Sequence, residues 1–224
     1  MNNGADTRLR MIEVAERLFA ERGIGAVSLR EIGAQAGQRN TAAARYHFGT
    51  KQGLVDAIFQ HRMSPINLRR MEMLAAFDRD GRGYDLRALT EAYLYPLSEM
   101  LGEVDRPSWY LRFCTHAAYL EGTAPTDLGR QDWTRGVHIV KSRLAELLSH
   151  LPDAVAADRW SLFAGYMTHA LADRELNIQH GRPALLSDRN IFLADLVDTA
   201  VALASAPVSD ATRAQMGVTF ASHP

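Results

Sequence analysis

Apolar residues recur along most of the chain with the spacing of an α-helix. Ile12, Ala15 and Phe19 form the first apolar stripe and predict a helix over residues 7–22. No segment alternates between apolar and polar residues with the period of two that marks a β-strand. The pattern therefore predicts an all-α fold. The later stripes predict helices over 51–77, 87–104, 107–121, 127–150, 154–179 and 188–205.

Two short helices joined by a turn are predicted over about residues 29–48. Ser28 and Glu31 have the spacing of a capping box, in which each side chain accepts the backbone N–H of the other residue. Gly37 suits the left-handed backbone that often ends a helix, and Asn40 is the predicted N-cap of the second helix. Two helices connected in this way are typical of a helix-turn-helix motif.

The second of these helices carries side chains that suit contact with DNA. Its arginine, asparagine and threonine residues offer hydrogen bonds to base edges and phosphates, and its alanines allow a close approach. Lys51 lies beside the first amides of the next helix, where a phosphate is favoured. The alternative is a pair of ordinary surface helices with solvated arginines. The candidate DNA-binding residues are Ser28, Arg39, Asn40, Thr41, Ala42, Arg45, Tyr46, His47 and Lys51.

Charge is distributed unevenly between the two ends of the chain. Residues 1–51 contain eight arginines or lysines and five acidic residues, a net charge of +3, whereas the whole chain carries −1 and the remainder therefore −4. A basic N-terminal segment followed by an acidic remainder fits DNA contact that is confined to residues 1–51. The alternative is a chance asymmetry of this size. Cys114 is the single cysteine of the sequence, which excludes an intrachain disulfide, and it is predicted to be buried.

Prolines interrupt two of the predicted helices. The pair Ser64 and Pro65 predicts a kink or break within residues 51–77, and Pro96 predicts a kink in the following helix. The sequence shows neither a signal peptide nor a run of about 18 apolar residues, so we expect a cytoplasmic protein that does not cross a membrane. The expected domains are a DNA-binding domain over 1–50, a helical body over 51–206 and a loosely ordered tail over 207–224.

Many residues of the N-terminal segment match a known pattern in order. The matching positions are Ile12, Ala15, Phe19, Gly23, Val27, Ser28, Ile32, Ala36, Gly37, Tyr46, Phe48, Lys51 and Leu54. Together they cover roughly residues 7–60 and resemble the DNA-binding domain of the TetR (tetracycline repressor)/AcrR family of bacterial transcriptional regulators. The chain departs from the family pattern by one additional residue between Gly37 and Phe48 and by Arg45 where a tyrosine is common.

The last two helices of the predicted body are apolar on more than one side. A helix of this kind needs cover on two sides, and small residues such as Gly165 and Ala170 permit close approach. The resemblance implies that both helices pair with their copies in a four-helix bundle of a homodimer, whereas burial inside a monomer is the alternative. The candidate dimer residues are Leu162, Tyr166, Ala170, Phe192, Leu196, Ala200 and Leu203.

The body is also rich in large side chains with polar tips. A cavity lined by them would suit a small apolar or aromatic molecule, and the resemblance implies an effector that alters the spacing of the heads and releases DNA. The alternative is that each residue is simply part of the core. The candidate ligand-binding residues are Tyr93, Met100, Trp109, Tyr110, Phe113, His116, Trp133, His138, Phe163 and Met167.

These patterns favour a ligand-responsive transcriptional regulator, in this family most often a repressor, that binds a roughly palindromic double-stranded operator as a dimer. An all-helical enzyme and a helix-turn-helix that docks a protein instead of DNA are the alternatives. Against an enzyme, the sequence contains no phosphate loop, Gly-x-Ser-x-Gly elbow or dinucleotide fingerprint. The histidines lack metal-ligand spacing, so we expect neither a metal nor another cofactor.

Overall fold

The chain folds into helices in the computed structural model. The structure describes residues 3–40, 42–103, 105–118, 132–182 and 187–219. Within these ranges there is no β-strand, and one isolated bridge joins Glu103 and Arg106. The predicted all-α fold is confirmed.

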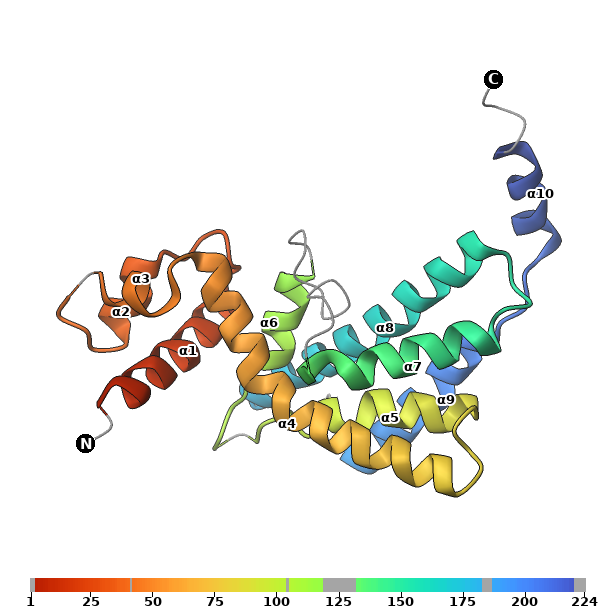
Figure 1. The fold of residues 1–224 in the computed structure, drawn as a ribbon, viewed down its shortest axis with the longest axis horizontal. Coiled ribbons are helices and arrows are strands. Elements are labelled where there is room, and N and C mark those ends of the chain that lie inside the picture. The colour runs from red at the N-terminus through yellow and green to blue at the C-terminus, as the bar shows by residue number, and fades with distance from the viewer. Residues whose placement is uncertain (1–2, 41, 104, 119–131, 183–186, 220–224) are drawn as a thin grey trace.

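Three helices and the start of a fourth form the N-terminal end of the molecule. They are α1 (Asn3–Arg22), α2 (Leu29–Gln35), α3 (Ala43–Phe48) and the long α4 (Lys51–Arg79). Helix α1 contacts α2 and α4, while α3 packs between α2 and α4. We call α1, α2 and α3 the head, and Figure 1 shows it at one end of the molecule with α4 leading away from it.

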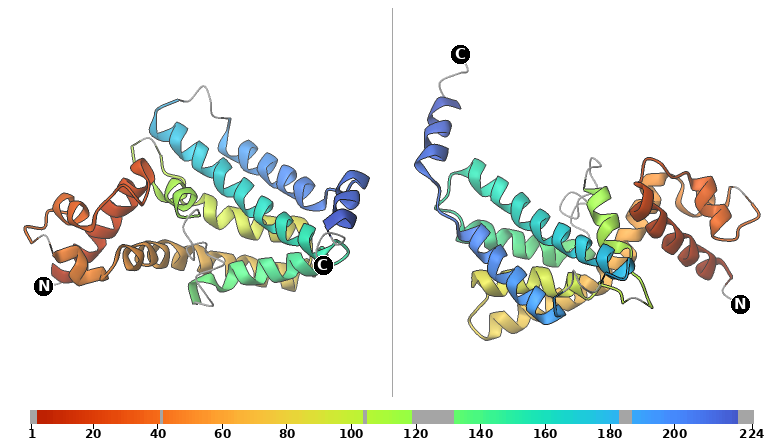
Figure 2. Two further views of the ribbon diagram at one scale, coloured as in Figure 1. Left: turned by 90° about the horizontal axis from the view of Figure 1, so that it is seen from above. Right: turned by 180° about the vertical axis from the view of Figure 1, so that it is seen from behind.

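The remaining helices form the body. They are α5 (Leu86–Ser98), α6 (Tyr110–Ala117), the 3₁₀ helix η1 (Asp132–Thr134), α7 (Arg135–Leu147), α8 (Asp153–Gln179) and α9 (Arg189–Ser205). Helix α5 contacts α7 and α9, and α8 contacts α6 and α9, so that α8 and α9 run together along one side of the bundle (Figure 2). The last helix, α10 (Asp210–Thr219), extends away from the bundle (Figure 1).

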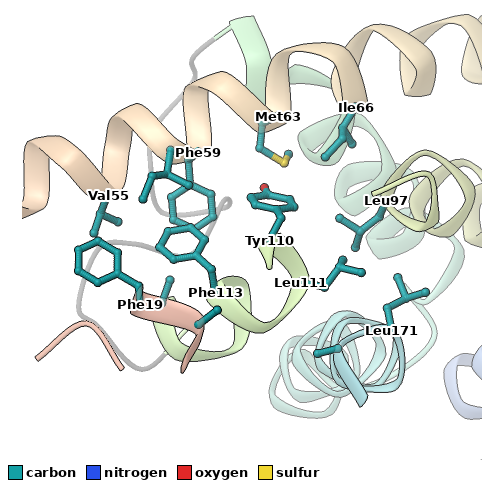
Figure 3. Packing of buried hydrophobic residues seen from close by; sticks show 14 of the residues in the cluster. Phe19, Val55, Phe59, Met63, Ile66, Leu97, Tyr110, Leu111, Phe113 and Leu171 are labelled. Atoms are coloured by element: carbon teal, nitrogen blue, oxygen red, sulfur yellow. The ribbon is translucent and has the colours of Figure 1, made fainter. Parts of the chain in front are cut away.

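One hydrophobic core runs from the head into the body. It includes Phe19 of α1, Phe59 of α4, Phe113 of α6 and Leu171 of α8 (Figure 3). The ring centroids of Phe19 and Phe113 are 6.2 Å apart, and those of Phe59 and Phe113 are 5.1 Å apart. The head is therefore in direct contact with α6 of the body. The domain boundary at residue 50 stays a prediction.

Helix α4 continues through Pro65, so the break that the sequence allowed there is wrong. Met63 and Ile66, on either side of the proline, are both buried, and this packing holds the two halves in one helix. The helix nevertheless changes direction along its length (Figure 1), which is the expected effect of a residue that removes one backbone donor. The Ser64 hydroxyl donates to the Gln60 carbonyl at 2.6 Å.

The helix predicted over 87–104 ends earlier than expected, at Ser98. Pro96 lies in its last turn and marks the end of the helix where a kink was predicted. Gly102 then approaches the chain so closely that a Cβ atom there would lie 2.4 Å from the Ser108 backbone nitrogen. The close approach reverses the chain direction, which no continuous helix to residue 104 would allow.

Other helix bounds differ at their ends. Asp188 caps α9, because its carboxylate accepts the N–H of Asn190 at 2.8 Å. The helix predicted over 127–150 begins with η1 and ends at Leu147, and its residues before 132 lie outside the described ranges. Helix α10 was not predicted, and nearly all of its described side chains are exposed. The residues of α10 form only a weak apolar stripe, because the helix packs little against the rest of the chain.

Candidate nucleic-acid interface and ligand cavity

Local backbone hydrogen bonds close both ends of α2. The Ser28 hydroxyl accepts the N–H of Glu31 at 3.2 Å, which confirms the serine as N-cap. The carboxylate of Glu31 pairs with Arg22 at 2.5 Å in place of the predicted bond to the serine amide. At the other end Gly37 has a φ of +76°, and Gln38 donates its N–H to the Gly33 carbonyl at 2.9 Å. This is a Schellman motif, which glycine adopts without steric strain.

Helix α3 begins at Ala43, three residues later than the predicted cap at Asn40. The Asn40 side chain accepts the N–H of Ala42 at 2.9 Å, and its carbonyl accepts the N–H of Ala43 at 3.1 Å. The prediction of Asn40 as N-cap is therefore wrong, because its side chain stabilises the preceding turn.

The outer face of α3 presents polar and aromatic groups. Arg45 is exposed, and Tyr46 is 87% exposed with its ring centroid 5.3 Å from that of His47. On the opposite face Ala44 is fully buried and Phe48 packs against the core. A tyrosine this exposed has little packing role within the chain, which suits contact with another molecule.

Three arginines close to α3 form no ion pair with any described residue: Arg30, Arg39 and Arg45. Arg30 and Arg45 line a surface hollow together with Thr50 and Lys51 at the start of α4. Unpaired guanidinium groups beside helix amides suit phosphate oxygens. Arg30 was not among the predicted DNA-binding residues, although its place on the polar side of α2 was a usable signal.

Lys51 has an intramolecular role that the sequence did not indicate. Its ammonium donates to the carbonyl of Ile24 at 2.9 Å and to that of Gly25 at 3.2 Å. Lys51 therefore ties the start of α4 to the turn after α1. Two of its three N–H donors are occupied in this way. A phosphate contact by Lys51 stays a prediction that competes with this structural role.

The remaining predicted DNA-binding residues divide between the turn and the hollow. Asn40 and Ala42 lie together in the turn, and Arg45 and Lys51 line the same hollow. Ser28 uses its hydroxyl as a helix cap and is exposed. Thr41 lies outside the described residues.

A helix-turn-helix whose second helix exposes polar groups beside unpaired arginines is typical of DNA-binding proteins. Residues 11–58 match the family model described as bacterial regulatory proteins, tetR family, and this match supports a regulator of that family. The protein is therefore a DNA-binding transcriptional regulator. No curated protein matches the chain.

A second hollow, of about 270 Å³, lies inside the body and is lined by residues of α4, α5, α6, α7 and α8. Two of the predicted ligand-binding residues, Tyr93 and Tyr110, belong to its wall. Most of the lining is apolar or aromatic, with a few polar groups, as is usual for a site that binds a small molecule. The lining residues are Phe59, Met63, Arg70, Tyr93, Leu97, Tyr110, Cys114, Thr115, Ala118, Val137, Trp160, Ser161, Ala164, Gly165, Thr168 and His169.

Eight of the predicted ligand-binding residues do not line this cavity. Some are fully buried in the core, and others pack partly buried elsewhere, because helical spacing reveals an apolar side but not which part of that side borders a void. The fully buried residues are Phe113, Phe163 and Met167, the partly buried ones are Met100, Trp109, Trp133 and His138, and His116 is exposed.

Arg70 and Trp160 are cavity residues that the sequence analysis missed. Arg70 follows Met63 and Ile66 at helical spacing and precedes Leu74, so it stands on the apolar stripe of α4. A charged residue within an apolar stripe could have indicated that Arg70 lines a site in the body. Cys114 also lines the cavity, and burial raises the pKa of its thiol well above the usual value. Cys114 was predicted to be buried, and the structure shows it half-buried in the cavity wall.

Part of the predicted dimer surface is exposed and part is not. Leu162 of α8 is 59% exposed, Tyr166 is exposed beside it, and Ile191 of α9 is 65% exposed. Leu196 and Ala200 are buried within the single chain, because that side of α9 packs against α5 and α8. This burial leaves these two residues little surface for a partner, and their place in the dimer interface stays a prediction. The remaining predicted residues, Ala170, Phe192 and Leu203, are partly buried.

Helix α6 connects the cavity to the head. Tyr110 and Cys114 of α6 line the cavity, while Arg112 of the same helix donates to the Ala20 carbonyl of α1 at 2.7 Å. On the other side the carboxylate of Glu175 in α8 accepts the N–H groups of Leu111 at 3.2 Å and Arg112 at 3.0 Å. The position of α6 is therefore fixed jointly by the head and by α8.

Two further observations concern membranes and metals. No single helix in the described ranges is long and apolar enough to cross a membrane, whereas the bent pair Arg189–Ser205 and Asp210–Met216 passes on length and composition alone. In the described part of the chain, no group of three or more histidine, cysteine, aspartate or glutamate side chains is arranged to hold a metal ion.

Proposed function

We propose that the protein is a ligand-responsive repressor that binds a roughly palindromic operator as a homodimer in the bacterial cytoplasm. In this proposal residues 1–50 read DNA, and residues 51–206 bind the effector and the second subunit. A two-fold dimer would set its two heads in successive major grooves, about 34–36 Å apart.

The observation that carries the proposal is the double role of α6. This helix borders the cavity through Tyr110 and Cys114 and contacts the head through Phe113 and Arg112. A ligand that moves α6 would therefore also move α1. Because binding to two half-sites requires one fixed spacing, such a shift would lower DNA affinity.

The apolar groups exposed on α8 and α9 support the dimer. Leu162, Tyr166 and Ile191 are large side chains on two helices that pack against each other. Exposed apolar groups on neighbouring elements mark interaction surfaces. A second copy of the chain is the partner that would bring two heads to a symmetric operator.

The test is selection of bound fragments from random DNA by the purified protein, followed by sequencing. We expect a palindromic motif, and affinity that falls steeply with salt because phosphate contacts release counterions. Arg45→Ala is expected to weaken binding by about 1–3 kcal/mol and to relax one position in each half-site if Arg45 reads a base.

Arg213→Ala, in the exposed helix α10, is the matched control and should leave the motif unchanged. An equal loss on random DNA would limit Arg45 to the phosphate backbone. If no motif is enriched even at low salt, the operator-binding part of the proposal fails, and a helix-turn-helix that docks a protein becomes the better interpretation.

A further inference from the structure

Arg70 is a buried arginine in the wall of the cavity. It lies on the apolar stripe of α4 between Ile66 and Leu74 and is 1% exposed. Arginine is rarely buried to this extent without an acidic partner. No described acidic residue forms an ion pair with Arg70. The body therefore holds an isolated positive charge beside an apolar cavity.

The hydrogen bonds of Arg70 account for only part of its donor capacity. Its Nε atom donates to the Ala92 carbonyl at 3.0 Å, and its Nη2 atom donates to the Tyr93 carbonyl at 3.1 Å. A guanidinium group has five N–H donors. The Nη1 atom is buried and has no hydrogen-bond partner among the described residues. These two hydrogen bonds join α4 to α5 and account for the Nε and Nη2 atoms. They give no reason for burying Nη1 without a partner.

The charge of Arg70 persists at neutral pH. Burial lowers the pKa of its guanidinium to about 10, which still keeps it protonated at pH 7. The Tyr93 ring, with its centroid 5.5 Å from the Arg70 Cζ atom, offsets the charge in part through a cation–π contact. An uncompensated charge in the interior is unfavourable, and an anion bound beside it would relieve that penalty.

A second polar group of the cavity wall also lacks a partner. The Tyr110 hydroxyl is buried without a hydrogen bond of normal geometry to any described residue, and the Cys114 thiol near it is a weak partner. Figure 3 shows this hydroxyl pointing toward α4 beside Met63. Arg70 and Tyr110 thus supply two unsatisfied donors to one cavity whose other lining residues include Phe59, Leu97 and Val137.

We propose that the cavity binds a small carboxylate with an apolar body, held by the free Nη1 donors of Arg70 and by the Tyr110 hydroxyl. This inference rests on the proposed function in taking the cavity as the effector site. The single charge of a carboxylate balances that of Arg70, whereas a dianionic phosphate would bring a second uncompensated charge. The cavity volume of about 270 Å³ suits a small ligand, near the lower end of the range for pockets that take small molecules.

The test compares acids with their neutral amides. Hexanoate, octanoate, decanoate and phenylacetate are titrated into the full-length protein, each beside its amide, by calorimetry and by intrinsic tryptophan fluorescence, to which Trp160 in the cavity wall contributes. We expect at least one acid to bind about ten- to a hundredfold more tightly than its amide, because the amide loses a charge-assisted hydrogen bond. Absence of such a preference throughout the series would overturn the proposal.

Variants connect this preference to Arg70. Arg70→Met is expected to abolish the difference between acid and amide, while Arg69→Met removes the same charge from the exposed side of the same helix and should preserve it. If Arg70→Met does not fold, Tyr110→Phe supplies the second measurement and should weaken acid binding about two- to tenfold. A preference that survives both Arg70→Met and Tyr110→Phe would overturn the assignment.

The failure of this inference is distinguishable from failure of the proposed function. If an acid binds through Arg70 but does not release DNA from the selected motif, the ligand class stands and the regulatory proposal fails. If only neutral compounds bind in the cavity and release DNA, the regulatory proposal stands and the carboxylate assignment fails.

Discussion

At the scale of single residues, the charged pair Glu16 and Arg62 shows how the head is attached to α4. Arg62 donates to both Glu16 oxygens, at 2.7 and 2.9 Å, and Glu16 is almost completely buried. Burial raises the pKa of Glu16 above its ordinary value of 4.5, although Arg62 acts in the opposite direction. The folded state therefore binds this proton more tightly than the unfolded chain, so ionisation of Glu16 lowers stability as pH rises above 4.5.

Arg62→Met is expected to destabilise the protein by about 3 kcal/mol at pH 7, because it leaves the Glu16 carboxylate buried and unpaired. Without Arg62 the pKa of Glu16 rises further, so the deficit should shrink as pH falls and Glu16 becomes protonated. Urea unfolding at pH 7 and pH 5 measures both effects.

Two further variants control this measurement. Glu16→Gln combined with Arg62→Met should recover much of the lost stability, whereas Arg79→Met on the exposed end of α4 should change little. A deficit that is independent of pH would contradict the account and attribute the loss to packing alone.

At the scale of an element, α6 depends on a group from another helix. Its N-cap residue Trp109 provides no side-chain hydrogen bond, and the first amides of the helix are accepted by Glu175 of α8. Burial raises the pKa of Glu175, and its hydrogen bonds to the Arg112 and Leu111 amides act against that rise. A helix of 8 residues has little stability of its own, so this cap and its packing hold it in position.

Glu175→Gln is expected to destabilise the protein by about 1–2 kcal/mol, since a neutral amide oxygen accepts these two N–H groups less well than a carboxylate. The first amides of α6 should exchange faster with solvent in a hydrogen-exchange experiment, while amides of α9 should not. Asp173→Asn, on the exposed side of α8, is the matched control. Equal acceleration in α6 and α9 would indicate global destabilisation and contradict a local capping role.

At the scale of the whole molecule, the exposed apolar groups of α8 and α9 predict the assembly state. Leu162→Glu is expected to convert the proposed dimer to a monomer, because pairing would bury an uncompensated carboxylate. Sedimentation velocity at several concentrations measures the change, and affinity for a palindromic site should fall with it.

Leu68→Glu is the control for the dimer measurement. Leu68 of α4 is 63% exposed, which is close to the exposure of Leu162, but it does not belong to the α8 and α9 surface. If both variants stay dimeric, the subunits associate through another face. If both become monomeric, the effect does not arise from the proposed interface.

The sequence predicted most of what depends on neighbours along the chain. Helical periodicity is local, and so are the cap at Ser28 and the stop at Gly37; each was found where expected. The match of the N-terminal domain to its family depends on the same local order of residues. The cap at Asn40 was wrong because its side chain accepts the N–H of Ala42 within the turn before α3.

The tertiary structure decided which neighbour each helix face meets. Leu196 and Leu162 are both apolar residues of apolar helices, yet the first packs inside the chain and the second is exposed, because only the packing of α5, α8 and α9 distinguishes the two sides. Lys51 donates hydrogen bonds to two backbone carbonyls that lie 26 and 27 residues away in sequence. Arg70 is shielded from solvent because α5 and α7 cover that part of α4. A period of 3.6 residues determines which side of a helix is apolar, whereas contacts between distant segments determine what that side touches.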